Sequence, residues 1–210
     1  MKKFVAIMLS CVLAACGGGS GGETYQDKTT PVLSVPSSII VAAVDGSGTA
    51  KSDPAIDAFL RGASATDAED GQIGVSNDAP ETFPLATTTV TFTATDAAGN
   101  SATATSSVTV SDQSAPDLTV PEDTSFVAVS GAGISSSDDD VAAYLAQTTA
   151  SDNVDVSVTV TNNAPDTFAI GETTVVFTAS DLAGNEVSAS VKVTVTGVSQ
   201  MGAAVKGPLV

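Results

Sequence analysis

Residues 88–100 read T-T-V-T-F-T-A-T-D-A-A-G-N, and residues 173–185 read T-T-V-V-F-T-A-S-D-L-A-G-N. Within the first stretch Val90, Phe92 and Ala94 alternate with threonine, and this period of two is typical of a half-buried β-strand. The D-x-x-G-N sequence that follows predicts a tight hairpin turn whose glycine has a positive φ angle. Each stretch therefore predicts a strand that ends in a hairpin.

The similarity between these two stretches extends over most of the chain. Residues 27–111 match residues 112–196 at a fixed offset of 85, with no gap. A fixed period of this length indicates two copies of one structural module. Each copy is near the size of a small immunoglobulin-type sandwich, which is large enough to bury a core of its own. The sequence therefore predicts two domains, residues 27–111 and residues 112–196.

Short strands separated by turn residues account for most of each module. In the first copy, residues 31–36 read as an edge strand punctuated by prolines, and residues 39–44 as a continuous apolar strand. Ile73 and Val75 alternate as positions of one strand, and residues 102–110 form the last strand. Several short strands at this spacing, with turn signals between them, predict an all-β sandwich.

One short helix is expected within each module. In the first copy Ser52 or Asp53 can cap it, and Ile56, Phe59 and Leu60 have the i, i+3, i+4 spacing of a buried helical stripe. The second copy repeats this pattern over residues 138–145, and core packing is the favoured role of both stripes. The predicted fold class is therefore all-β, with two tandem immunoglobulin-like β-sandwiches that each carry one short inserted helix.

The composition excludes several classes of function. The chain has no histidine, and its only cysteines are Cys11 and Cys16, so neither a catalytic triad nor a Cys/His zinc site can be built within the modules. The formal net charge is −17, which makes nucleic acid a poor partner because phosphate binding needs Lys and Arg. The sequence gives no sign of an enzyme.

The N-terminus reads as a targeting signal. A basic Met-Lys-Lys precedes an apolar run that is too short to span a bilayer as a permanent helix, and the run ends in L-A-A-C at residues 13–16. This tetrapeptide resembles the lipobox of bacterial lipoproteins, which implies a signal peptide over residues 1–15 and lipidation of Cys16. Residues 16–26 would then be a lipidated Gly/Ser tether. Because Gly17 is not Asp, the resemblance favours an outer-membrane lipoprotein; the alternative is an ordinary secretory signal with a chance cysteine.

Both modules resemble the hyalin repeat (HYR) family. The resemblance rests on a D-x-x-x-P start, an x-V-P near the first strand, a closing x-V-T-V, and the D-A-P-x-T-F-P-x-x-T-T-T-V-T-F-T-A-T-D-A-A-G-N segment of residues 78–100. The T-A-T-D-A-A-G-N hairpin is its most diagnostic part. The resemblance implies an immunoglobulin-like fold and a role in adhesion and extracellular assembly.

Acidic and amide side chains on the turns are candidate metal ligands. In an immunoglobulin-like sandwich these turns, and the start of the module, are expected to meet at one end. Oxygen ligands from separate loops suit Ca²⁺, which is therefore a possible cofactor, although Asp and Asn are also ordinary turn residues. The candidates are Asp27, Asp67, Asp70, Asp96 and Asn100 in the first module, with Glu69 beside them, and Asp112, Asp152, Asp155, Asp181 and Asn185 in the second. The second set, at the linker, is expected to bind Ca²⁺ more tightly than the first set.

The favoured function is that of a lipid-anchored bacterial surface protein whose modules act as adhesive or stalk elements. The membrane would be contacted through the lipid only, and the ligand would be an extracellular protein or glycan. One alternative is a glycan- or protein-binding receptor, and another is a non-catalytic spacer of a larger surface hydrolase. Residues 197–210 read as a linker or as the start of a further module, because they contain V-K-G-P-L.

Overall fold

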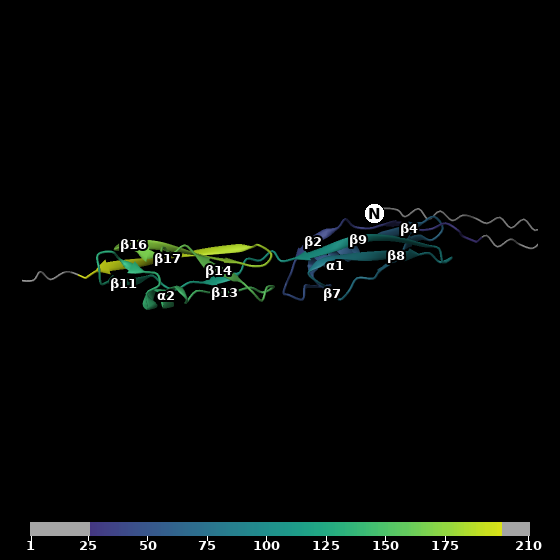
Figure 1. The fold of residues 1–210 in the computed structure, drawn as a ribbon. Helices are drawn as coiled ribbons and strands as arrows, with labels where there is room; N and C mark the ends of the chain where they lie inside the picture. The colour runs from purple at the N-terminus through teal and green to yellow at the C-terminus, as the bar shows by residue number, and fades with distance from the viewer. Residues whose placement is uncertain (1–25, 199–210) are drawn as a thin grey trace, which may run out of the picture.

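The computed structural model describes residues 26–198. In Figure 1 the two modules lie end to end along one axis, each built almost wholly of strands. The expected lipidation site at Cys16 and the expected linker after residue 198 lie outside the described residues. No helix within residues 26–198 is long and apolar enough to cross a membrane.

The first module has two main sheets and one short strand pair. One sheet has the order β1-β4-β5 and the other the order β2-β9-β8-β6, while β3 pairs with β7. The elements are β1 (Val32–Ser34), β2 (Ile39–Ala42), β3 (Thr49–Ala50), α1 (Pro54–Arg61), β4 (Ser64–Asp67), β5 (Gly71–Ile73), β6 (Val75–Asn77), β7 (Thr82–Phe83), β8 (Ala86–Thr95) and β9 (Ser101–Ser111).

The second module repeats this arrangement. Its four-stranded sheet has the order β11-β17-β16-β14, and β10-β13 and β12-β15 are paired strands. The elements are β10 (Asp117–Thr119), β11 (Thr124–Ala128), β12 (Ile134–Ser135), α2 (Asp139–Leu145), β13 (Thr149–Ser151), β14 (Thr159–Asn162), β15 (Thr167–Phe168), β16 (Gly171–Ser180) and β17 (Glu186–Gly197). The predicted fold class, two tandem sandwiches with one short helix each, is confirmed.

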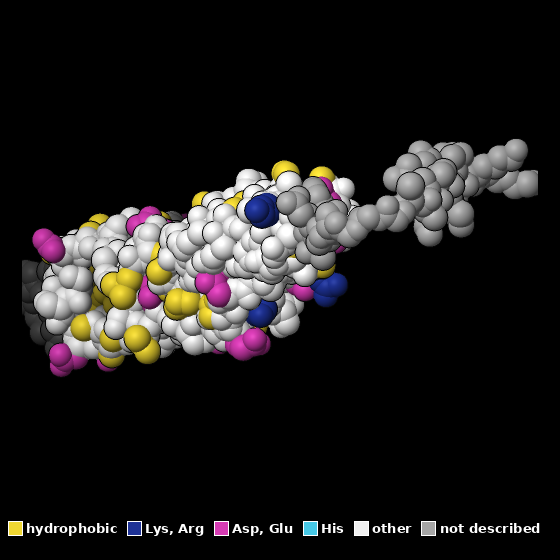
Figure 2. Space-filling model, turned by 90° about the vertical axis from the view of Figure 1, so that its right-hand side faces the viewer, with side chains coloured by type: hydrophobic (Ala, Val, Ile, Leu, Met, Phe, Trp, Pro, Cys, Tyr) yellow, Lys and Arg dark blue, Asp and Glu magenta, His cyan; other side chains and the backbone are white. Residues whose placement is uncertain are grey.

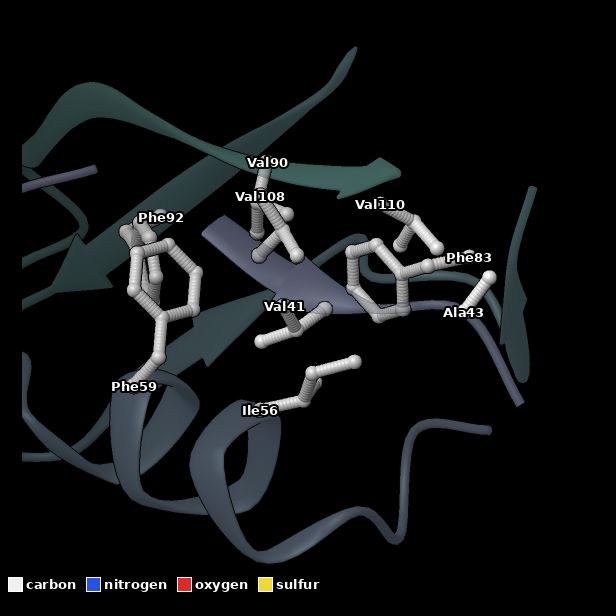
Figure 3. Close-up of a cluster of buried hydrophobic side chains, with 9 residues drawn as sticks. All are labelled: Val41, Ala43, Ile56, Phe59, Phe83, Val90, Phe92, Val108 and Val110. Atoms are coloured by element: carbon white, nitrogen blue, oxygen red, sulfur yellow. The ribbon is translucent and has the colours of Figure 1, made fainter. Parts of the chain in front are cut away.

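The long hairpin of each module supplies one wall of its core. In the first module β8 and β9 pair antiparallel from Ala86↔Val110 to Thr95↔Ser101. Because side chains alternate between faces, Val90, Phe92 and Ala94 all point inward and are completely buried, as the sequence predicted. Figure 3 shows the core cluster: Val41, Ala43, Ile56, Phe59, Phe83, Val90, Phe92, Val108 and Val110.

The helix α1 closes this core from the opposite side. The Asp53 carboxylate caps it by accepting a hydrogen bond from the Ala55 amide at 2.9 Å. Ile56 and Phe59 are buried, and the Phe59 ring meets Phe92 edge to face, with ring centroids 5.8 Å apart. Burial of an aromatic side chain of this size contributes about 1.5–3 kcal/mol to folding stability. A helix this short is marginal on its own, so the packing of its apolar stripe against the core stabilises it.

One expectation about the strands is wrong. Ile73 and Val75 do not share a strand, because Gly74 separates β5 from β6. The two strands belong to different sheets: β5 pairs with β4, and β6 pairs with β8. The chain thus changes sheets at Gly74, and an alternation of apolar residues on either side of a glycine does not distinguish one strand from two.

The turn glycines have the conformation that the D-x-x-G-N sequence predicts. Gly99 has φ +90° and Gly184 has φ +91°. Among the described residues, a Cβ built on Gly184 would have no neighbour within 4 Å, so a side chain there would meet backbone strain but no steric clash with them.

Replacing Gly184 with Val should therefore destabilise the second module through strain alone, by about 1–3 kcal/mol. Gly131→Val is the matched control, because Gly131 also has no neighbour within 4 Å but lacks a positive φ. Thermal unfolding of the chain without residues 1–22 measures both. Equal melting temperatures for the two variants would contradict the assigned turn geometry.

Candidate metal centre

Three segments meet at one end of each module, which we call the tip. In the first module they are the chain start at Asp27, the turn between β4 and β5, and the turn between β8 and β9. The Ala97 amide donates to Asp70 Oδ2 at 2.8 Å, and Asn100 Nδ2 donates to the Asp27 carbonyl at 3.3 Å. These bonds hold the separate loops against one another.

The tip of the first module gathers five carboxylates into two overlapping groups. Ligand atoms of Asp27, Asp67 and Glu69 lie within 4.8 Å of one another, and so do those of Asp27, Asp70 and Asp96. Asp27 belongs to both groups. Carboxylates at this separation repel one another, so the arrangement favours a cation or water between them.

A threonine that the sequence reading missed connects part of this cluster. The Thr29 hydroxyl lies 2.7 Å from Asp27 Oδ1, 3.0 Å from Glu69 Oε2 and 3.3 Å from Asp67 Oδ2. Asp67 Oδ1 accepts the Glu69 amide at 2.9 Å, and this bond is the main reason that the pKa of Asp67 lies below its ordinary value. The D-x-T spacing, which forms a local side-chain turn, was the available signal.

The tip of the second module contains one compact group. Ligand atoms of Asp112, Asp155 and Asp181 lie within 4.8 Å of one another. Asp152 lies on the same loop but outside this group, and its Oδ1 accepts the amides of Val154 at 2.7 Å and Asp155 at 3.0 Å. Asp152 therefore shapes the loop that carries Asp155.

The hairpin aspartates are held by the asparagines that follow them. Asp181 Oδ1 accepts the Asn185 amide at 2.7 Å and Oδ2 accepts Asn185 Nδ2 at 2.8 Å, and Asp96 has the same two bonds from Asn100. Burial acts to raise the pKa of Asp181, but the bonds from Asn185 and the turn amides outweigh it, and the pKa lies below its ordinary value. Asp181 is thus a buried carboxylate that stays ionised at neutral pH. Asn100 and Asn185, both candidate ligands, face the aspartates in this arrangement and position them.

Comparison with known proteins identifies the family of both modules. A family profile described as HYR domain matches residues 26–110 and again residues 112–195. The chain belongs to the HYR domain family. The recognition made from the sequence is therefore confirmed, for both modules.

Two curated relatives share this similarity. The chain is 34% identical over 181 residues to Hyalin of Lytechinus variegatus, and 33% identical over 180 residues to Hyalin of Strongylocentrotus purpuratus. Each match covers 82% of this chain, but only 32% of the first relative and 14% of the second. The HYR modules described here thus correspond to a minor part of those proteins.

Solved structures of cadherin ectodomains are also similar. Drosophila N-cadherin EC1-4 matches with a TM-score of 0.38 and 16% identity, covering 80% of this chain and 50% of that one. Protocadherin Gamma B2 EC3-6 matches with a TM-score of 0.34 and 16% identity, covering 81% and 53%.

The residues at both HYR tips fit a hard divalent cation. Asp27 Oδ2, Asp112 Oδ2 and Asp152 Oδ2 are buried and have no hydrogen-bond partner among the described residues. A buried carboxylate oxygen without a partner is costly, and coordination of a cation would remove that cost. The donors are all carboxylate oxygens, which suit Ca²⁺ rather than a metal that prefers nitrogen or sulfur.

Proposed function

We propose that the chain is an extracellular, lipid-anchored array of HYR modules that acts in adhesion or as a stalk, with Ca²⁺ at the module tips. The observation that carries this proposal is the position of the second tip. Its Asp112 belongs to the linker, so the acidic group of Asp112, Asp155 and Asp181 lies where the modules join. A cation bound there would tie the linker to the second module.

The acidic surface and residue types favour a non-catalytic role. On the face seen in Figure 2 the Lys and Arg side chains are few, and Asp and Glu are spread between polar and isolated apolar patches. The absence of histidine from the whole sequence removes the commonest general base. The remaining clustered titratable groups are turn carboxylates, whose chemistry suits ion binding.

The first tip carries the larger acidic set, so we propose that its affinity for Ca²⁺ exceeds that of the second. This reverses the order that the linker position alone suggests. Its two groups of carboxylates share Asp27, and Glu69 adds a ligand that the second module replaces with Val154. Affinities of about 10⁻⁴–10⁻³ M are typical of extracellular calcium modules.

The proposed anchor rests on sequence alone. The L-A-A-C tetrapeptide at residues 13–16 directly follows the apolar run, and a Gly/Ser tether separates Cys16 from the first module. A Gly/Ser-rich composition of this kind is typical of linkers, which suits an array held at an outer membrane.

A receptor for a small extracellular ligand is the second candidate. A hollow of about 500 Å³ beside α1 is lined by Lys51, Arg61 and Gln72, among others. In the second module the equivalent positions are Ser136, Ala146 and Ser157, so the two cationic side chains that line this hollow are specific to the first module. Lys51 pairs with Glu81 and Arg61 pairs with Asp57, which also lines the hollow, so a neutral polar glycan suits it better than an anion.

Calcium should raise the melting temperature of residues 23–198, because a ligand that binds only the folded state stabilises it. At a calcium concentration of about ten times the dissociation constant, each site raises the free energy of unfolding by about 1.4 kcal/mol. Asp155→Asn should abolish the stabilisation of the second module by calcium, and Asp70→Asn should abolish that of the first module. Asp140→Asn, on the exposed side of α2, is the control and should keep both gains. Calorimetry with calcium or a chelator decides, and an unchanged melting temperature would leave the tips as plain acidic turns.

Cys16→Ser should abolish lipid attachment and release the mature protein from membranes. Metabolic labelling with a palmitate analogue, followed by membrane fractionation, measures both effects. Cys11→Ser is the control, because Cys11 lies within the expected signal peptide and should leave labelling intact. Labelling of the Cys16→Ser protein would contradict the proposed anchor.

A further inference from the structure

The two modules touch through the tip of the second and the opposite end of the first, which we call the base. Asn153 Nδ2, in the tip, donates a hydrogen bond of 2.9 Å to the carbonyl oxygen of Val44 in the base. Val154 is partly buried against the core cluster of the first module. Gly46 permits this approach, because a Cβ there would lie 2.9 Å from the Val154 carbonyl oxygen. The junction thus uses an amide donor, an aliphatic side chain and a glycine.

The internal repeat allows the same tip positions to be compared in the two modules. At the offset of 85, Asn153 corresponds to Ala68 and Val154 corresponds to Glu69. The first tip therefore lacks the amide donor, and it has a carboxylate where the second has the aliphatic side chain. The two tips differ at both positions that make the junction.

The base, in contrast, is preserved in both modules. Gly131 corresponds to Gly46, and Val129 corresponds to Val44. Within residues 26–198, a Cβ on Gly131 would meet no atom within 4 Å, so no described residue fills the space that Val154 occupies at the first base.

The second base also exposes a group of apolar side chains. The exposed fractions are 88% for Val129, 50% for Ile170 and 48% for Val198. These three residues, with Gly131, surround a hollow of about 160 Å³. Single exposed aliphatic residues are ordinary on a protein surface, but a contiguous group around a hollow indicates a contact site.

We propose that the base of the second module is a docking surface for the tip of a further module of this same type. The occupant is a module that carries an amide side chain followed by an aliphatic residue, as at Asn153–Val154. The existing junction supports this occupant, because the equivalent base of the first module already holds such a tip.

A second copy of this chain is the wrong occupant. Its outer tip would bring Glu69 over the apolar hollow, where burial of a carboxylate is costly. A tip-to-base contact between copies would also be open-ended and would generate filaments. The pair Ala68–Glu69 therefore blocks self-assembly while leaving the base available to the correct partner.

The test fuses a second copy of residues 114–198 after Val198, in the chain without residues 1–22, so that Gly197 and Val198 of the base are kept. The new Val198–Ser114 peptide bond corresponds to the native Gln113–Ser114 bond at the repeat offset of 85. Cysteines replace Ser190 and the same residue of the added copy, and spin labels on them report the distance across the new junction. Labels at Thr105 and Ser190 calibrate the native junction, since residues 23–198 contain no other cysteine.

The proposal predicts a distance distribution across the new junction as narrow as that across the native one. Gly131→Val should broaden it, and so should an added copy that carries Ala and Glu in place of Asn153 and Val154. Gly74→Val, at an open position remote from both bases, should change neither junction. A broad distribution in the parent fusion, or a narrow one in all variants, would overturn the proposal. Both junctions are measured with a calcium chelator present and without residues 1–22, so the result is independent of calcium and of the lipid anchor.

Discussion

The long antiparallel hairpin of each module positions its core, its acidic tip and its junction with the other module. One face of β8 and β9 closes the core, because the register fixes which side chains point inward. The same hairpin carries Asp96 on its turn, and in the second module it carries Asp181. Its outgoing strand runs from tip to base and delivers the chain to Asp112. Core, ion-binding candidates and module junction are thus positioned by one element.

The two ends of a module have different physical tasks. The tip concentrates carboxylates whose charges repel, and several of their oxygens are already used to shape the loops. The base presents a glycine and aliphatic side chains. When a tip packs on a base, apolar surface of the base contacts the neighbouring module. The acidic group of the tip then lies at the junction between the two modules. A repeat with unlike ends can therefore extend in one direction only, as expected of an array of HYR modules.

Much of this could be predicted from the sequence where the information is local. The alternation around Phe92, the cap at Asp53 and the turn glycine Gly184 each follow from neighbouring residues, and the structure agrees with all three. The change of sheet at Gly74 was missed because it depends on which distant strand pairs with each side. The contact of Asn153 with Val44 was missed for the same reason. The different roles of Asp152, which shapes the loop, and Asp155, which belongs to the acidic group, were also not predicted. They depend on which carboxylate oxygen accepts each loop amide.

Residual dipolar couplings of backbone amides, measured on residues 23–198 in millimolar calcium, test whether the tip of the second module is fixed on the base of the first so that the modules form one rod. For one rod, the couplings of both modules are expected to fit a single alignment tensor, with the relative orientation seen in Figure 1. Two different tensors, with a reduced magnitude in one module, would show that the modules move independently and would contradict this rigid arrangement.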